Sequence, residues 1–184
     1  MNDLVATWEV PLCDKIHKVE FEHGTTTGRR VIRLDDETII KRDWMFKLVG
    51  TEMFEIKGNN GQTFAKCEIF INAGVGFTYE YILFVNGKQL KKFREKQSRI
   101  IRSWNYENED KQWKIILEKG TLNVWVNGEK KDTVNDFAEE GTEICFELDD
   151  EAKCCIKTIS SGNKNKGIIY VLYINDVEIP ECPI

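Results

Sequence analysis

The sequence predicts an all-β fold made of two tandem, internally homologous antiparallel β-sandwich domains. Two observations lead to this prediction: apolar and polar residues alternate along many short segments, and four motifs recur in the same order about 90 residues apart. The 184 residues suffice for two domains of that size, each with its own core. A hydrophobic content of 41% and a charged content of 31% are typical of a folded, water-soluble protein.

The recurring motifs set the expected domain boundaries. Four segments of the first half have counterparts in the second half: Lys18–Thr25 with Lys114–Thr121, Gly50–Glu52 with Gly141–Glu143, Ala65–Ile69 with Ala152–Ile156, and Tyr81–Asn86 with Tyr170–Asn175. Small loop insertions between two related units would produce offsets that drift in this way. We therefore expect a first sandwich over 1–92, a basic linker over 93–102 and a second sandwich over 103–184.

Turn signals place several hairpins. Asn86-Gly87 and Asn127-Gly128 each follow a valine, and this dipeptide favours a two-residue hairpin turn. Asn175-Asp176 occupies the equivalent place near the end of the second unit. Each of these dipeptides should therefore join two paired strands.

A further two-residue turn is expected at Lys119-Gly120. It would set Ile115 opposite Val124, on the face that buries Trp113. Trp125 would then lie opposite Lys114, on the other face. If nothing covers that face, Trp125 is exposed and marks a contact surface.

A second register argument brings two cysteines together. Alternation on both sides of a loop at Asp149–Glu151 sets Cys145 opposite Cys155, between the opposite-charge pairs Glu147–Lys153 and Glu143–Lys157. Directly opposed strand residues lie roughly 4.5–5.5 Å apart, within the range of a disulfide. Cys145 and Cys155 are a candidate redox pair. The simpler interpretation is that all six cysteines are free thiols in a reducing compartment.

Helical periodicity is nearly absent. Asp43–Gly50 could form one short turn ended by glycine. Lys88–Arg102 carries seven Lys/Arg and one acid, and could be a frayed helix or an irregular linker between the units. With so little helix and with regularly spaced turns, an all-β architecture is favoured.

Composition disfavours several classes of protein. The longest apolar run, Ile168–Ile174, has seven residues, whereas a membrane helix needs about 20. The segment Met1–Trp8 lacks the features of a secretory signal, so the cytoplasm is the expected location, without membrane association. A net charge of −5 argues against nucleic acid as a partner, because binding to phosphates needs clustered positive charge.

No metal or cofactor site is expected from the spacing. The cysteines include no Cys-x-x-Cys pair, and His17 and His23 are the only histidines. A Cys–His nucleophile would require one of these histidines to meet a thiol. Strand and turn positions are the simpler interpretation of both, so we expect no enzyme activity and no catalytic residues.

The segment His23–Arg30 is the most loop-like polar cluster. Its two glycines, three threonines and two arginines could bind an anion or a phosphopeptide, although the spacing of a P-loop is missing. A turn between two strands is the simpler interpretation. His23, Arg29 and Arg30 join Trp125 as the candidate interaction surface.

Several longer stretches resemble the Fas apoptotic inhibitory molecule family. In the first unit they are Phe21–Arg30, Trp44–Gly50, Gly76–Tyr81 and Asn86–Lys88; in the second they are Val124–Gly128, Gly141–Glu143, Ser160–Gly162 and Gly167–Ile169. The resemblance covers nearly the whole chain and is more specific in the first unit. The cysteines at 145, 154 and 155 depart from the family pattern, so the family does not support a redox role for them.

The resemblance implies a cytosolic, non-enzymatic protein of two β-sandwiches that protects cells from apoptosis triggered by death receptors. It also implies protein partners in survival signalling, and protection against stress-induced protein aggregation through contact with misfolded clients. Open strand edges would serve such contacts and would allow a weak homodimer. The alternative is a small-ligand-binding or thiol-redox protein that uses the Gly-Thr loop or Cys145 and Cys155.

Overall fold

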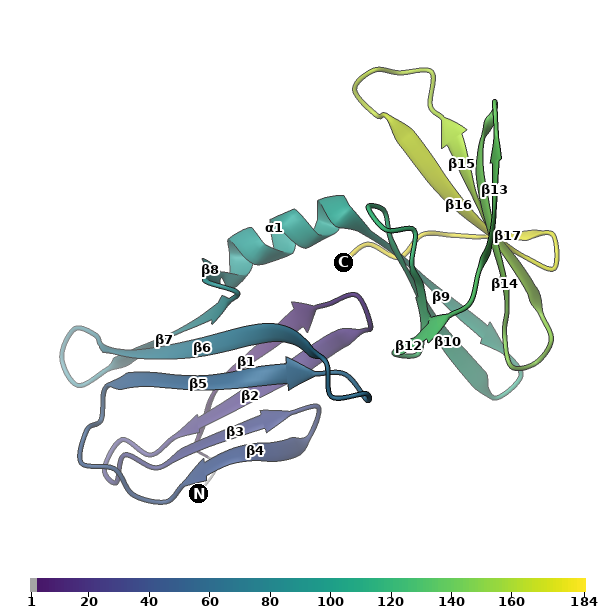
Figure 1. Ribbon diagram of the computed structural model, residues 1–184. Coiled ribbons are helices and arrows are strands. Elements are labelled where there is room, and N and C mark those ends of the chain that lie inside the picture. Colours follow the sequence, from purple (N-terminus) through teal and green to yellow (C-terminus); the bar gives the residue numbers. More distant parts are fainter. Residues whose placement is uncertain (1–2) are drawn as a thin grey trace. The chain divides into compact units, whose positions relative to one another are not determined.

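The computed structural model describes residues 3–184 and divides the chain into two compact units (Figure 1). The first comprises the chain up to Leu12 together with Ile16–Gln97, and the second comprises Cys13–Lys15 together with Ser98–Ile184. Each unit contains two antiparallel sheets with the strands in sequence order. The all-β prediction is confirmed.

The first unit is a sandwich of two four-stranded sheets. One sheet consists of β1 (Leu4–Pro11), β2 (Ile16–His23), β3 (Arg30–Leu34) and β4 (Glu37–Arg42), and the other of β5 (Gly50–Lys57), β6 (Thr63–Ala73), β7 (Tyr79–Val85) and β8 (Lys88–Gln89). Alternate residues of both sheets point inward because side chains alternate along a strand. They form one core, which includes Val19, Phe21, Ile32, Ile56, Ile69 and Leu83.

The second unit repeats this plan. Its first sheet consists of β9 (Ile101–Asn108), β10 (Lys111–Glu118), β11 (Val124–Val126) and β12 (Glu129–Lys131). Its second sheet consists of β13 (Val134–Ala138), β14 (Gly141–Glu147), β15 (Lys153–Ser160), β16 (Ile168–Ile174) and β17 (Val177–Ile179). The core between them includes Trp104, Trp113, Ile115, Ile144, Ile156 and Leu172.

Within the described residues the only helix is α1 (Leu90–Ile100), in the basic segment that the sequence left open between a helix and an irregular linker. Its buried residues are Phe93 and Gln97, which lie four apart and therefore on one helix face. Phe93 belongs to the core of the first unit, and the Gln97 side-chain amide donates to the carbonyl of Pro11 at 3.1 Å. No described helix is long and apolar enough to cross a membrane.

The same hydrogen-bonded pair recurs in all four sheets. A lysine on the second or third strand lies opposite the Asp or Asn that begins a hairpin turn, and the lysine N–H donates to the side-chain oxygen of that residue at 2.7–3.0 Å. The turn residue in return donates its own N–H to the lysine carbonyl at 2.8–2.9 Å. The pairs are Lys18–Asp35, Lys66–Asn86, Lys114–Asn127 and Lys153–Asn175.

These turn residues all have positive φ angles, between 47° and 50°. Asn and Asp tolerate this left-handed conformation better than other non-glycine residues. The residue that follows each of them also has a positive φ, as a type I′ turn requires. The hairpin turns predicted at Asn86-Gly87, Asn127-Gly128 and Asn175-Asp176 are therefore confirmed.

The predicted register of β10 and β11 is wrong by two residues. Ile115 lies opposite Val126 and Ile116 opposite Trp125, because the connection is a loop of five residues, 119–123, in place of a two-residue turn. Leu122 has a φ of 58°, and its N–H donates to the carbonyl of Glu118. A shift of two residues keeps every side chain on its expected face, so the core is unchanged.

We predict that Asn86→Ala destabilises the first unit by about 1–2 kcal/mol. Alanine removes the acceptor for the Lys66 N–H and tolerates the positive φ poorly. Urea denaturation followed by circular dichroism measures the change. The control is Asn59→Ala, in an exposed turn without positive φ. Equal stability of both variants would show that the side-chain contact contributes nothing.

Candidate interaction site at the loop end of the first unit

Three loops lie together at one end of the first sandwich (Figure 1). They are residues 24–29 between β2 and β3, 43–49 between β4 and β5, and 74–78 between β6 and β7. We call them the loop end. Arg30 reaches from the start of β3 to the carbonyl of Val49, and the ring of His23 at the end of β2 lies 5.0 Å from that of Tyr79 at the start of β7. These contacts join both sheets.

Loop 24–29 is closed by its own backbone and docked on loop 43–49. The N–H of Gly24 donates to the carbonyl of Arg29 at 2.9 Å, and the N–H of Met45 donates to the carbonyl of Thr27 at 3.0 Å. Gly28 has a φ of +68°, and a Cβ atom there would lie 2.4 Å from the carbonyl oxygen of Met45. Only glycine fits this position, which explains one of the two glycines in the motif.

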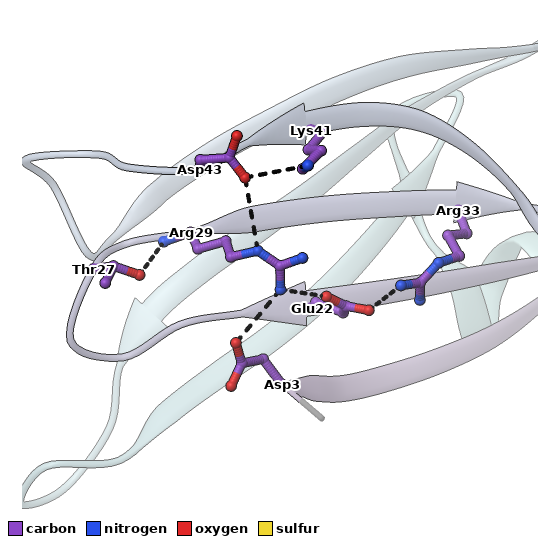
Figure 2. Close-up of polar contacts among 7 residues, drawn as sticks. All are labelled: Asp3, Glu22, Thr27, Arg29, Arg33, Lys41 and Asp43. Atoms are coloured by element: carbon purple, nitrogen blue, oxygen red, sulfur yellow. Dashed lines mark hydrogen bonds and ion pairs between the residues drawn. The ribbon is translucent and has the colours of Figure 1, made fainter. Parts of the chain in front are cut away.

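The Arg29 guanidinium is the centre of a network of acids and bases (Figure 2). It donates to the Glu22 carboxylate at 2.6 Å and lies 3.5 Å from Asp3 and 4.0 Å from Asp43. Arg33 pairs with the other oxygen of Glu22. Burial by itself would raise the pKa of Glu22, but the hydrogen bonds from Arg33 and Arg29 outweigh it and lower the pKa.

Arg30 lies inside the unit, with its side chain only 3% exposed. Its guanidinium donates to Glu52 at 2.9 Å and to the carbonyls of Lys47 and Val49 at 2.9 and 3.0 Å. Arg42 donates to the same carboxylate from the surface. Removing one partner of such a buried pair typically costs about 3–5 kcal/mol. Arg30 therefore holds loop 43–49 in place.

His23 is also buried, at 2% exposure, with its Nδ1 atom 2.8 Å from the hydroxyl of Tyr81. Its ring packs against Tyr79, Tyr81 and Phe21. Burial and the charge of Arg30 lower the pKa of His23 below its usual 6.5. The neutral ring therefore prevails at neutral pH and acts as a bridge between the two sheets.

Four large apolar side chains project from the loop end. Phe46, Val75 and Phe77 are 90% or more exposed, and Trp44 is 57% exposed. Trp44 and Phe46 contact each other edge to face, with ring centroids 4.3 Å apart. Isolated exposed apolar residues are ordinary, but such a group gathered at one end of a stable unit is typical of a protein contact surface.

The exposed side chains at the loop end differ from the candidate interaction surface expected from the sequence. His23 and Arg30 are buried and serve as supports, and Arg29 is engaged by three carboxylates. The anion site considered for this loop has no support, because both arginines already pair with acids of the same unit. The exposed aromatic residues beside them were not singled out from the sequence, since alternation does not extend into loops.

Trp125 lies in the second unit and is half-buried, with a buried indole nitrogen. Its opposed residue is Ile116, not Lys114, and Ile116 is 1% exposed. That part of the outer sheet face is therefore covered, and Trp125 does not stand out as an exposed aromatic.

Cys145 and Cys155 are directly opposed on β14 and β15, as expected, and both thiols are free. Within the part of the chain that the structure describes, they and Glu143 are the one group of three side chains placed to hold a metal ion. This group lies in the second unit, outside the loop end.

We predict that the protein loses stability as the pH falls from about 8 to about 5, partly through His23. Because folding lowers the pKa of His23 below 6.5, the unfolded chain gains a proton more readily as the pH falls through this value. In His23→Gln this contribution is absent, so its stability should depend less on pH. Urea midpoints across the range measure the stability of both proteins; His17 is present in each, so its contribution cancels in the difference. Parallel curves would contradict the prediction.

The chain matches the family model described as Fas apoptotic inhibitory molecule over residues 4–182. It is 46% identical over 181 residues to Fas apoptotic inhibitory molecule 1 of Bos taurus, covering 98% of this chain and 88% of that protein. Identity to the proteins of the same name from Homo sapiens and Mus musculus is 45%, covering 98% of both chains in each case. This chain therefore belongs to the Fas apoptotic inhibitory molecule family.

Proposed function

We propose that this protein inhibits apoptosis triggered by death receptors, and that it does so in the cytoplasm as a non-enzymatic protein-interaction module. The names of its relatives support the anti-apoptotic role. The observation that supports the mechanism is the group of exposed apolar side chains at the loop end. The partner is a protein of survival or death-receptor signalling.

The fixed loops and the polar residues around them make the loop end suitable for binding a protein partner. Loops 24–29 and 43–49 are fixed before binding by Arg30, Arg29 and Gly28, and loop 74–78 is closed by a hydrogen bond from the Gly74 N–H to the Thr78 carbonyl, so little conformational entropy would be lost on association. Aromatic side chains in the centre of an interface contribute most of its binding energy, while a polar surround excludes water. Here the exposed threonines 25–27 and the acids around Arg29 would form such a surround.

The absence of enzyme activity is supported by the state of the reactive groups. His17 and His23 are engaged by Asp35 and Tyr81. Burial raises the pKa of Cys13, Cys67 and Cys154 to about 12, which leaves almost no thiolate at neutral pH. This state of the thiols and histidines supports a non-enzymatic role.

The proposal is tested in Fas-bearing cells that lack their own family member and express this chain. The wild type should reduce caspase activation after Fas is cross-linked. The double variant Phe46→Ser with Phe77→Ser should lose most of this protection, because hot-spot aromatics contribute roughly 2 kcal/mol or more each. Its folding should be unchanged, since both side chains are exposed.

The matched control is Val134→Ser with Phe137→Ser, which removes two exposed apolar side chains of β13 in the second unit. It should protect like the wild type. Equal protection by both double variants would remove the loop end from the mechanism. A wild-type chain that gives no protection would refute the anti-apoptotic function itself.

The same exposed group favours a second function, the protection of misfolded clients from aggregation. Apolar side chains on a stable scaffold can cover the apolar surface of an aggregating chain. We expect near-stoichiometric amounts of the protein to suppress light scattering by a heat-labile client in reducing buffer, and the Phe46→Ser, Phe77→Ser variant to suppress it less. Scattering that is unaffected by the wild type would exclude this function.

A further inference from the structure

The outer face of the second unit's larger sheet carries a row of directly opposed residues. Val134, Cys145, Cys155 and Tyr173 lie side by side on four neighbouring strands, β13 to β16. Cys145 and Cys155 are half-buried, and they line a surface hollow of about 1090 Å³ together with Glu143, Lys157 and Tyr173. The two thiols are thus accessible to a small solute.

The hydrogen-bond pattern places this cysteine pair at a close approach of the strands. The N–H of Leu148 donates to the carbonyl of Ala152 at 3.1 Å, so this is a hydrogen-bonded pair. Hydrogen-bonded and non-hydrogen-bonded pairs alternate along an antiparallel ladder. The Cys145–Cys155 pair lies three pairs along the ladder from the Leu148–Ala152 pair, so it is a non-hydrogen-bonded pair. In such a pair the Cα atoms are only about 4.5 Å apart and the side chains lie closest.

Glu143 supplies a third donor. It lies two residues before Cys145 on β14 and therefore on the same sheet face. One carboxylate oxygen of Glu143 and the two sulfur atoms all lie within 4.8 Å of one another. Lys157, which is opposed to Glu143, holds the carboxylate through Oε1 at 3.2 Å. This contact orients the carboxylate and still leaves it a second oxygen.

The surroundings of Cys155 disfavour its thiolate form. Burial raises the pKa of Cys155 to about 12, and a hydrogen bond with Cys145 and the charges of Cys145 and Glu143 add to this effect. A thiol with so little thiolate reacts slowly with oxidants, which weakens the case for a redox pair. A bound divalent cation would reverse the situation, since it stabilises all three anions at once.

The first unit offers an internal comparison. Phe54 lies opposite Cys67 there, as Phe146 lies opposite Cys154 in the second unit. The neighbouring pair on the outer face is Met53 opposite Glu68 in the first unit, and Cys145 opposite Cys155 in the second. The scaffold therefore does not require two cysteines at this place, and the donor set is particular to the second unit.

We propose that Cys145, Cys155 and Glu143 form a binding site for a borderline-soft divalent cation of the zinc class, with water as the fourth ligand. Binding replaces waters of the hydrated cation by two metal–sulfur bonds and one metal–oxygen bond to the protein, one water stays bound, and the two thiols release one proton each to solvent. Two thiolates and one carboxylate leave the occupied site with a net charge of −1, which Lys157 partly neutralises. Thiolate ligands select zinc over magnesium and calcium, which prefer oxygen.

The movement of the three side chains that metal binding requires is small. Bonds of about 2.0–2.3 Å in a tetrahedral zinc site separate the ligand atoms by about 3.3–3.8 Å. The donors lie within 4.8 Å of one another and therefore approach by about 1.5 Å at most, which side-chain rotation supplies. The Lys157–Glu143 ion pair acts as the outer contact that fixes a ligating carboxylate.

The proposal is tested by titrating the reduced full-length protein with Cd²⁺, whose thiolate complexes absorb in the ultraviolet. The wild type should bind one Cd²⁺ per chain with a thiolate-to-cadmium absorption band and the release of two protons. A large excess of Zn²⁺ should displace the cadmium, and Zn²⁺ alone should raise the melting temperature with its concentration. Cys145→Ser and Cys155→Ser should each lower the affinity at least about 100-fold, and Glu143→Gln about 10-fold.

The matched control is Cys182→Ser, a half-buried cysteine of the same unit that lies outside the cluster; it should bind like the wild type. Circular dichroism verifies that each serine variant is folded. The proposal is overturned if the wild type shows no thiolate–cadmium band, or if Cys145→Ser binds cadmium as tightly as the wild type. A Cys145–Cys155 disulfide in protein prepared without reductant, combined with no cadmium binding after reduction, would also overturn it and identify a redox pair.

Discussion

The pairing of a lysine backbone with the Asp or Asn that begins a hairpin turn is the constraint on which both units depend. It occurs once in each of the four sheets, at Asp35, Asn86, Asn127 and Asn175. A slip of one residue at any of these pairs would turn the whole apolar face of a strand toward water. By joining side chain and backbone across the ladder, each pair fixes which residues enter the core.

The loop end of the first unit reverses the usual distribution of residue types. Arg30, Glu52 and Glu22 lie inside, whereas Phe46 and Phe77 lie in solvent. Buried ion pairs add little net stability compared with apolar packing, but they fix geometry because each charge must meet its partner. Three of the four stretches that resemble the family in the first unit converge here: the motif 21–30 supplies the supports, and the motifs 44–50 and 76–81 supply exposed aromatics and the Tyr79 and Tyr81 rings. This convergence supports a common purpose for residues far apart in the sequence.

The two units show how one scaffold carries different surfaces. Much of the two cores corresponds, including Cys67 and Cys154, which are buried opposite Phe54 and Phe146 at equivalent places. Their outer faces do not correspond, because a residue that points to solvent is free of packing constraints. The loops with exposed aromatic residues in the first unit and the cysteine pair with Glu143 in the second are therefore different surfaces on a repeated framework.

The sequence by itself determined the fold class, the repeat, three hairpin turns and the opposition of Cys145 and Cys155, because strand alternation and turn residues are local signals. It failed at 119–123, where Thr121 and Asn123 bind the Glu118 carboxylate and lengthen the loop. Only the tertiary structure decided that His23 and Arg30 are buried, because their partners Tyr81 and Glu52 are 58 and 22 residues away. It also decided that Glu143 joins the two thiols and that two loops gather their aromatic residues at one end, since packing between strands, and not any local pattern, sets these distances.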